Sequence, residues 1–93
     1  MNARYYYKEE NGKFYIYDNK STTPNLAIAV EQTEDIATAQ CFKFNFIDTV
    51  DELAYKDDTD ALYSLVRAYG DNPISGYARQ AIGYLERDRY EFH

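Results

Sequence analysis

The chain has 93 residues, of which 45% are apolar or aromatic and 28% are charged. This length allows one hydrophobic core and excludes a chain of several ordinary domains, so we predict a single domain over residues 1–93. The apolar fraction is too high for an intrinsically disordered chain. Cys41 is the single cysteine, which excludes an intramolecular disulfide and a thiolate metal cluster.

Negative charge is concentrated in the middle of the sequence. The net charge is −6, and residues 31–60 hold nine acids against Lys43 and Lys56, whereas the segments on either side are nearly balanced. Such a field repels phosphate backbones and attracts basic surfaces. We therefore predict a protein partner with a basic surface and no direct binding of nucleic acid.

The first residues do not have the pattern of a targeting segment. Residues 1–8 carry tyrosines where a secretory signal needs an unbroken apolar stretch. No segment approaches the ~20 apolar residues of a membrane span. We expect a cytoplasmic protein without membrane contact.

The N-terminal residues have the pattern of a β-hairpin. Two aromatic-rich stretches, residues 4–10 and 13–18, flank Asn11-Gly12, a dipeptide that supplies the two positive φ angles of a type I′ turn. A two-residue loop places Glu10 opposite Lys13 and fixes which side chains share a face. One face, suited to the core, carries Tyr5, Tyr7, Phe14 and Ile16, and the other carries Tyr6, Lys8, Lys13, Tyr15 and Tyr17.

A third strand is predicted over residues 25–30. Leu26, Ile28 and Val30 alternate there with small alanines, which favours an antiparallel strand whose large side chains join the core face. Thr33, followed by two acids, then predicts a helix N-cap.

Residues 40–47 fit two structures. Phe42, Phe44 and Phe46 alternate with polar residues as in a strand, whereas Ala37, Cys41 and Phe44 have helical spacing. We favour a short helix followed by a fourth strand over one long helix.

The remaining residues predict two or three helices. Residues 49–52 form a capping box that predicts a helix over residues 50–56. A second helix carries an apolar stripe from Leu62 to Tyr69 and ends at Gly70. A third begins at Asn72-Pro73 and keeps one apolar face as far as Leu85. The order predicts an α+β fold, with an antiparallel meander of three or four strands followed by two or three helices packed on one face.

The chain lacks the residue combinations of common catalytic and metal sites. His93 is the only histidine, so triads that depend on histidine are excluded. Cys41 has no histidine partner, and we interpret it as a buried packing thiol. The acids of residues 57–60 do not have the spacing of a calcium loop, and helix capping explains them. We predict a protein that is not an enzyme, with no catalytic residue, metal or cofactor.

The main functional hypothesis is an acidic binding protein that docks onto a basic surface of a larger partner. By analogy, small phage or plasmid counter-defence proteins, such as anti-CRISPR or antirestriction proteins, mimic nucleic acid and block the groove that holds it. The hairpin tyrosines suit protein contact better than base stacking because the overall field is negative. The candidate partner-binding residues are Glu34, Asp35, Asp48, Asp51, Glu52, Asp57, Asp58, Asp60, Tyr6, Tyr15 and Tyr17.

Three alternatives remain open. The acids can form an ordinary solvated face. The protein can be a structural homodimer that pairs through the hairpin edge or the final helix. It can also be a small enzyme or ligand-binding domain that uses Tyr55 or Tyr63 with Asp51 or Glu52.

Overall fold

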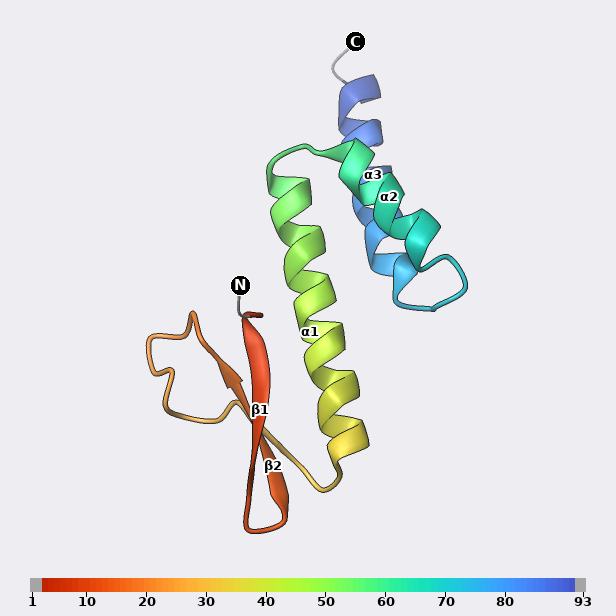
Figure 1. Ribbon diagram of the computed structural model, residues 1–93. Coiled ribbons are helices and arrows are strands. Elements are labelled where there is room, and N and C mark those ends of the chain that lie inside the picture. Colours follow the sequence, from red (N-terminus) through yellow and green to blue (C-terminus); the bar gives the residue numbers. More distant parts are fainter. Residues whose placement is uncertain (1–2, 92–93) are drawn as a thin grey trace. The chain divides into compact units, whose positions relative to one another are not determined.

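The computed structural model describes residues 3–91 and shows an α+β fold, in which a three-stranded antiparallel sheet precedes three helices (Figure 1). The elements are β1 (Tyr5–Glu10), β2 (Lys13–Asp18), β3 (Ala29–Glu31), α1 (Glu34–Tyr55), α2 (Thr59–Ala68) and α3 (Ser75–Glu91). The predicted fold class is confirmed. The chain forms two compact units, Met1–Asn45 and Phe46–His93, and α1 contributes to both.

The hairpin has the predicted turn and register. Asn11 and Gly12 have φ angles of 55° and 78°, as a type I′ turn requires. The strands β1 and β2 pair from Glu10 opposite Lys13 to Tyr5 opposite Asp18. The two predicted faces of the hairpin are therefore confirmed.

The third strand is shorter than predicted, and its faces are reversed. Val30 pairs with Tyr15, and Ala29 pairs with Ile16, so alanine takes the inner position and valine the outer one. Leu26, Ile28 and Val30 are 65%, 50% and 45% exposed. The prediction that these side chains join the core was wrong, because a shift of one residue in strand pairing moves every side chain to the other face.

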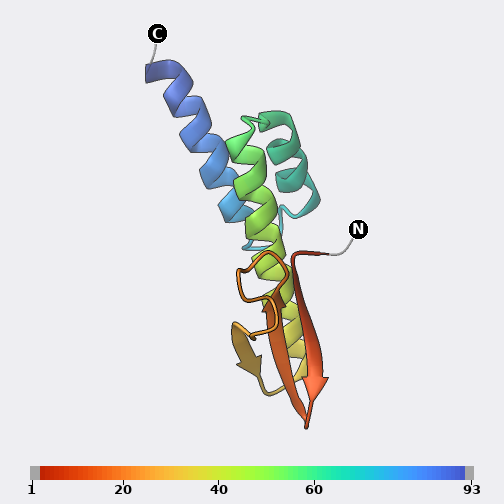
Figure 2. The ribbon, with the colours of Figure 1, turned by 90° about the vertical axis from the view of Figure 1, so that its left-hand side faces the viewer.

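The first half of α1 packs on the inner face of the sheet. Ile16 of β2 and Ala37 and Cys41 of α1 are buried. The Phe44 ring lies 5.3 Å from the Tyr5 ring, and the Asn45 side chain binds both the N–H and the C=O of Tyr5, at 2.9 and 3.0 Å. In Figures 1 and 2 this part of α1, drawn in yellow, runs alongside the strands. Asn45 thereby satisfies the backbone groups at one end of the edge strand β1, so that another strand cannot pair with β1 there.

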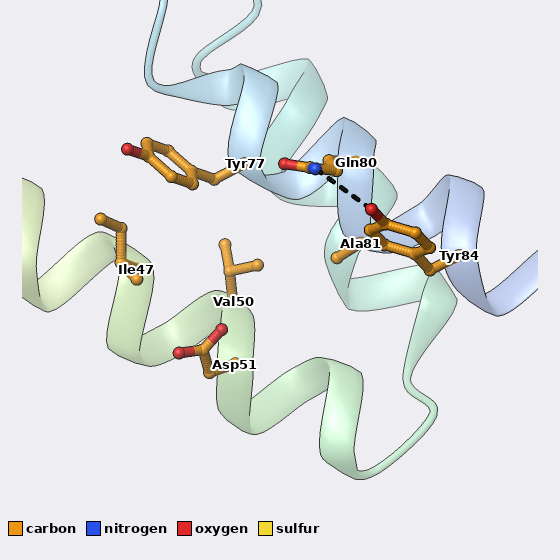
Figure 3. Close-up of a pocket in the computed structure, with 7 residues that line it drawn as sticks. All are labelled: Ile47, Val50, Asp51, Tyr77, Gln80, Ala81 and Tyr84. Carbon is orange, nitrogen blue, oxygen red and sulfur yellow. Dashed lines mark hydrogen bonds between the residues drawn. The ribbon is translucent and has the colours of Figure 1, made fainter.

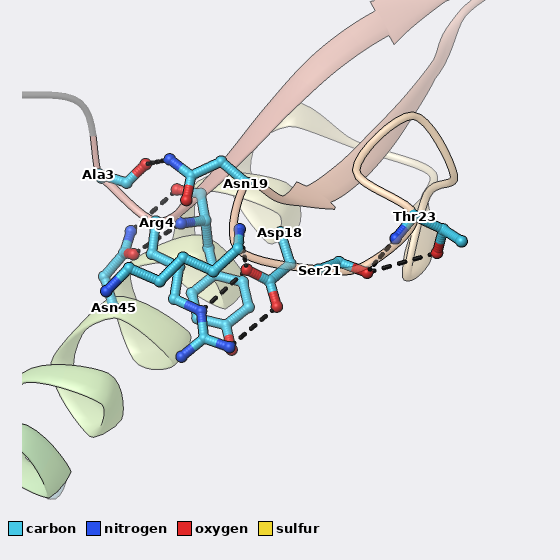
Figure 4. Close-up of polar contacts among 9 residues, drawn as sticks. Ala3, Arg4, Asp18, Asn19, Ser21, Thr23 and Asn45 are labelled. Atoms are coloured by element: carbon cyan, nitrogen blue, oxygen red, sulfur yellow. Dashed lines mark hydrogen bonds and ion pairs between the residues drawn. The ribbon is translucent and has the colours of Figure 1, made fainter.

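A bidentate ion pair connects the start of β1 to the end of β2. Arg4 donates from Nε to Asp18 Oδ1 at 2.8 Å and from Nη2 to Asp18 Oδ2 at 3.1 Å (Figure 4). The backbone N–H of Lys20 also donates to Asp18 Oδ1, at 3.0 Å. The hydrogen bond from Arg4 is the main cause that lowers the pKa of Asp18. This pair holds the open end of the hairpin.

Helix α1 is one continuous helix of 22 residues. Both the predicted fourth strand over residues 42–46 and the separate helix over residues 50–56 were wrong. Thr33 is the N-cap, as predicted, and accepts a hydrogen bond from the Ile36 N–H at 3.2 Å. Phe44 packs in the first unit and Phe46 in the second, because residues two apart on a helix do not share a face. Alternating phenylalanines therefore serve two cores.

The second unit has its own core between the last part of α1 and helices α2 and α3. Its buried members are Phe46, Val50, Leu62, Ala78 and Ile82. The Phe46 ring meets the Tyr69 ring edge to face, with 5.3 Å between centroids. The apolar stripe predicted from Leu62 to Tyr69 lies on α2 and its C-cap residue, Tyr69, and its first member, Leu62, is fully buried.

A Schellman-type turn ends α1 and leads into α2. Asp57 has a φ of 57°, and the N–H groups of Asp57 and Asp58 donate to the carbonyls of Ala54 and Leu53. Asp58 is then the N-cap of α2, and its carboxylate accepts from the Ala61 N–H at 3.1 Å. The capping interpretation of this acidic run is confirmed for Asp58.

The turn between α2 and α3 differs in detail from the prediction. Gly70 follows α2 as predicted, but its φ is not positive, and a Cβ there would lie 3.0 Å from the Val66 carbonyl oxygen. Close approach of the backbone therefore explains this glycine. Asn72 Oδ1 accepts from the Ile74 N–H at 3.0 Å, and α3 begins at Ser75, after the predicted Asn72-Pro73 start.

None of the described helices combines the length and the apolar character that a lipid bilayer span requires.

Candidate partner-binding surface

The two units carry very different charges. The first unit, with five basic and six acidic residues, has a balance of −1, whereas the second, with five basic and ten acidic residues, has a balance of −5. Arg67 and Arg79 donate to neutral acceptors, the Ser64 hydroxyl and the Gly70 carbonyl. The second unit therefore holds most of the negative potential.

Three of the predicted acidic residues lie on one face of α1. Asp48, Asp51 and Glu52 are three and four positions apart, which places them on neighbouring turns of the same side. Asp51 and Glu52 are exposed, and Asp48 is half-buried. Glu52 pairs with Lys56 at 3.0 Å across one helical turn, an exposed contact that contributes little to stability.

Three more predicted acids, Asp57, Asp58 and Asp60, lie where α1 ends and α2 begins. All three are exposed. Asp58 has a structural role as the α2 cap, and Asp60 lies in the first turn of α2, where the helix dipole favours a negative charge. Helix stability therefore accounts for Asp58 and Asp60 without a partner, but not for Asp57.

The remaining two acidic candidates, Glu34 and Asp35, lie in the first unit, at the start of α1. Glu34 accepts a hydrogen bond of 2.9 Å from the Tyr7 hydroxyl, which connects α1 to the sheet. The structure thus divides the predicted acidic segment between the two units, with six of its eight site residues in the second.

An open groove lies between α1 and α3 in the second unit. Its volume is about 250 Å³, and Figure 3 shows the side chains that line it. Aliphatic side chains form part of the wall, Tyr77 and Tyr84 contribute rings that are 42% and 58% exposed, and Asp51 adds a carboxylate. The lining residues are Ile47, Val50, Asp51, Tyr77, Gln80, Ala81 and Tyr84.

Sequence reasoning found Asp51 but missed the rest of this groove as a site. Tyr77, Gln80, Ala81 and Tyr84 follow the i, i+3, i+4, i+7 spacing of one helix face, but the predicted apolar face of this helix included only Tyr77 and Ala81 of these four. The exposure of both tyrosines shows that this face is only partly covered.

The predicted tyrosine face lies on the outer side of the sheet, in the first unit. The rings of Tyr6 and Tyr17 stack with 5.6 Å between centroids, and Lys8 Nζ lies 5.8 Å from both. Tyr15 shares this face with Val30 through their cross-strand pairing. All three tyrosines are half-buried, and they form a second surface with aromatic, aliphatic and cationic groups together.

Other residues singled out in the sequence have structural surroundings or lie outside the described residues. Cys41 is buried, as predicted, and burial raises the pKa of its thiol. Tyr63 donates its hydroxyl to Glu86 Oε1, and Tyr55 is 93% exposed. Within the residues whose side chains are described, no three His, Cys, Asp or Glu residues are grouped as a metal site would require. His93 lies outside the described residues.

Comparisons with known protein families, with curated protein sequences and with solved structures found no match to this chain.

Proposed function

We propose that this protein is a non-enzymatic binding domain whose acidic second unit docks onto a basic surface of a larger protein. The observation that carries the proposal is the balance of −5 in that unit, next to a groove with exposed aromatic side chains. Complementary charge steers association and selects the partner, and exposed tyrosines supply contact area at low entropic cost. The basic surface is one that holds nucleic acid, and the protein acts as an inhibitor that occupies it, as a cytoplasmic counter-defence protein does.

The test compares two variants that lose the same number of charges. The first carries Asp51→Asn, Glu52→Gln, Asp58→Asn and Asp60→Asn in the second unit, and asparagine at position 58 keeps the α2 cap. The matched control carries four amide substitutions in the first unit, at Glu9, Glu10, Glu31 and Asp35. Each variant and the wild type are used to capture the partner from the native host at low and at physiological salt.

The wild type and the control variant should retain the same partner, and the variant of the second unit should lose it. Purified partner should then lose its bound nucleic acid when wild-type protein is added, as measured by a mobility shift. Retention of the partner by the second-unit variant, or capture that does not weaken as salt rises, contradicts the proposal, because a contact between exposed charges is screened.

A second candidate function is a structural homodimer formed through the outer sheet face. The observation that favours it is the exposure of Leu26, Ile28 and Val30, of which Val30 pairs with Tyr15 of the tyrosine face, since exposed apolar surface is typical of an interaction site. Sedimentation equilibrium would show a dimer that Val30→Lys converts to a monomer. A wild-type monomer at high concentration contradicts this candidate.

A further inference from the structure

We propose that the groove between α1 and α3, which Tyr77 and Tyr84 flank, receives an arginine side chain of the partner whose guanidinium pairs with Asp51. The inference rests on the proposed function, because it names the group by which a basic partner is recognised. The contact is between one arginine of the partner and Asp51 in the groove of the second unit.

The size of the groove fits one side chain. At about 250 Å³ it is smaller than the ~300–1,000 Å³ of a site for a drug-sized molecule, and it is open along one side. A single long side chain can enter from a partner surface without any change in the helices.

The charge in the groove selects a cation. The Asp51 carboxylate forms no hydrogen bond or ion pair with the residues whose side chains are described, and the unit around it has a balance of −5. An apolar or aromatic side chain in the groove would remove water from this carboxylate without replacing its hydrogen bonds. An acidic side chain would be repelled.

The rings and the aliphatic wall select arginine over lysine. A guanidinium is planar, stacks on aromatic rings and forms two parallel hydrogen bonds to one carboxylate. Its methylene stem lies along apolar surface, which Ile47, Val50 and Ala81 provide here. Lysine presents a strongly hydrated point charge and gains less from the two rings, Tyr77 and Tyr84.

The experiment uses the full chain and two capped peptides of equal charge, hexaarginine amide and hexalysine amide. Isothermal titration in 0.15 M salt measures affinity, and amide chemical shifts locate the bound peptide. We expect hexaarginine to bind at least about threefold more tightly than hexalysine, because of ring stacking and bidentate pairing. The largest shifts should fall on the residues that line the groove.

Asp51→Asn should lower hexaarginine affinity by about tenfold, which is the loss of one charge-assisted contact. The matched control is Asp71→Asn, an exposed residue of the second unit that does not line the groove, which removes the same charge and should lower affinity by less than about threefold. Tyr84→Leu should abolish the preference for arginine. Its control is Tyr55→Leu, which changes an exposed tyrosine outside the groove and should leave that preference unchanged.

The possible failures are distinguishable. If the two peptides bind equally and Asp51→Asn lowers affinity no more than Asp71→Asn, the arginine site is refuted while an acidic binding unit stands. Shifts that map to the outer sheet face also refute the arginine site. If neither peptide binds, the proposed function fails together with this inference. Circular dichroism of each variant confirms that the helices are retained.

Discussion

Replacing Asp57 with glycine should stabilise the protein. Asp57 occupies the C′ position of the turn after α1 with a φ of 57°, a conformation that favours glycine. An L-residue in this region costs about 1–2 kcal/mol, and glycine loses about 0.5–1 kcal/mol more chain entropy on folding. The net expectation is a gain of about 0.5–1 kcal/mol in the free energy of unfolding, which corresponds to a rise in Tm of a few degrees.

The control for Asp57→Gly is Asp57→Asn, because asparagine removes the carboxylate charge at the end of α1 but retains the Cβ. Urea unfolding followed by circular dichroism compares the two variants with the wild type. Glycine should be more stable than asparagine by about 0.5 kcal/mol, since asparagine keeps the Cβ that crowds the left-handed conformation. If both variants gain the same stability, charge alone accounts for the effect, and the strain argument is refuted.

Three further predictions concern stability and use denaturant unfolding as the measurement. Leu62→Ala should lower the free energy of unfolding by about 2–5 kcal/mol because Leu62 is fully buried. Tyr55→Ala, at a residue that is 93% exposed, should change it by less than about 0.5 kcal/mol. Equal effects would contradict the core described above. Asp58→Ala should cost about 1 kcal/mol and Asp58→Asn much less, and a similar loss in both would exclude the capping role. Asp18→Asn should destabilise at neutral pH, where the ionised carboxylate pairs with Arg4. Because the pKa of Asp18 is lowered in the folded state, this stabilisation is present above its unfolded pKa and is lost as pH falls through the folded pKa, so a pH-independent difference would contradict the pairing.

Local turn chemistry made the hairpin predictable, whereas strand pairing at longer range was not. Asn11-Gly12 fixes both the loop length and the register, so the faces of β1 and β2 follow directly. No comparable turn fixes the pairing register of β3. The alternation in residues 25–30 therefore leaves open whether the large apolar side chains or the alanines face inward. We assigned the larger side chains to the core, but the pairing of Ala29 with Ile16 places the small residue there.

The continuous helix α1 was mispredicted because its apolar residues serve two cores. Ala37 and Cys41 are buried in the first unit, and Phe46 and Val50 are buried in the second. A single stripe with a 3.6-residue period therefore does not run through the whole helix, and the phenylalanine alternation imitates a strand. The capping-box pattern at residues 49–52 lies inside this helix, where its backbone donors are already satisfied.

The acidic candidates were predictable as a charge run, but their grouping was not. Sequence position placed Asp48, Asp51 and Glu52 close together, and helical spacing would have set them on one face. The groove depends on two segments about thirty residues apart, one in α1 and one in α3. Only tertiary packing brings Tyr77 and Tyr84 near Asp51, so periodicity within α3 alone indicated nothing beyond an amphipathic helix.

Because α1 supplies buried side chains to both units, separating them would divide a helix and leave each part with a short fragment. Isolated helices shorter than ~12–15 residues are marginal in water, so neither fragment would persist without the core that it packs into. When one core forms, it should therefore stabilise α1 and so favour the helical conformation of the part of α1 that belongs to the other core. A substitution that destabilises the sheet should therefore lower the hydrogen-exchange protection of amides in the last turns of α1. The two units should also unfold in one transition rather than in two.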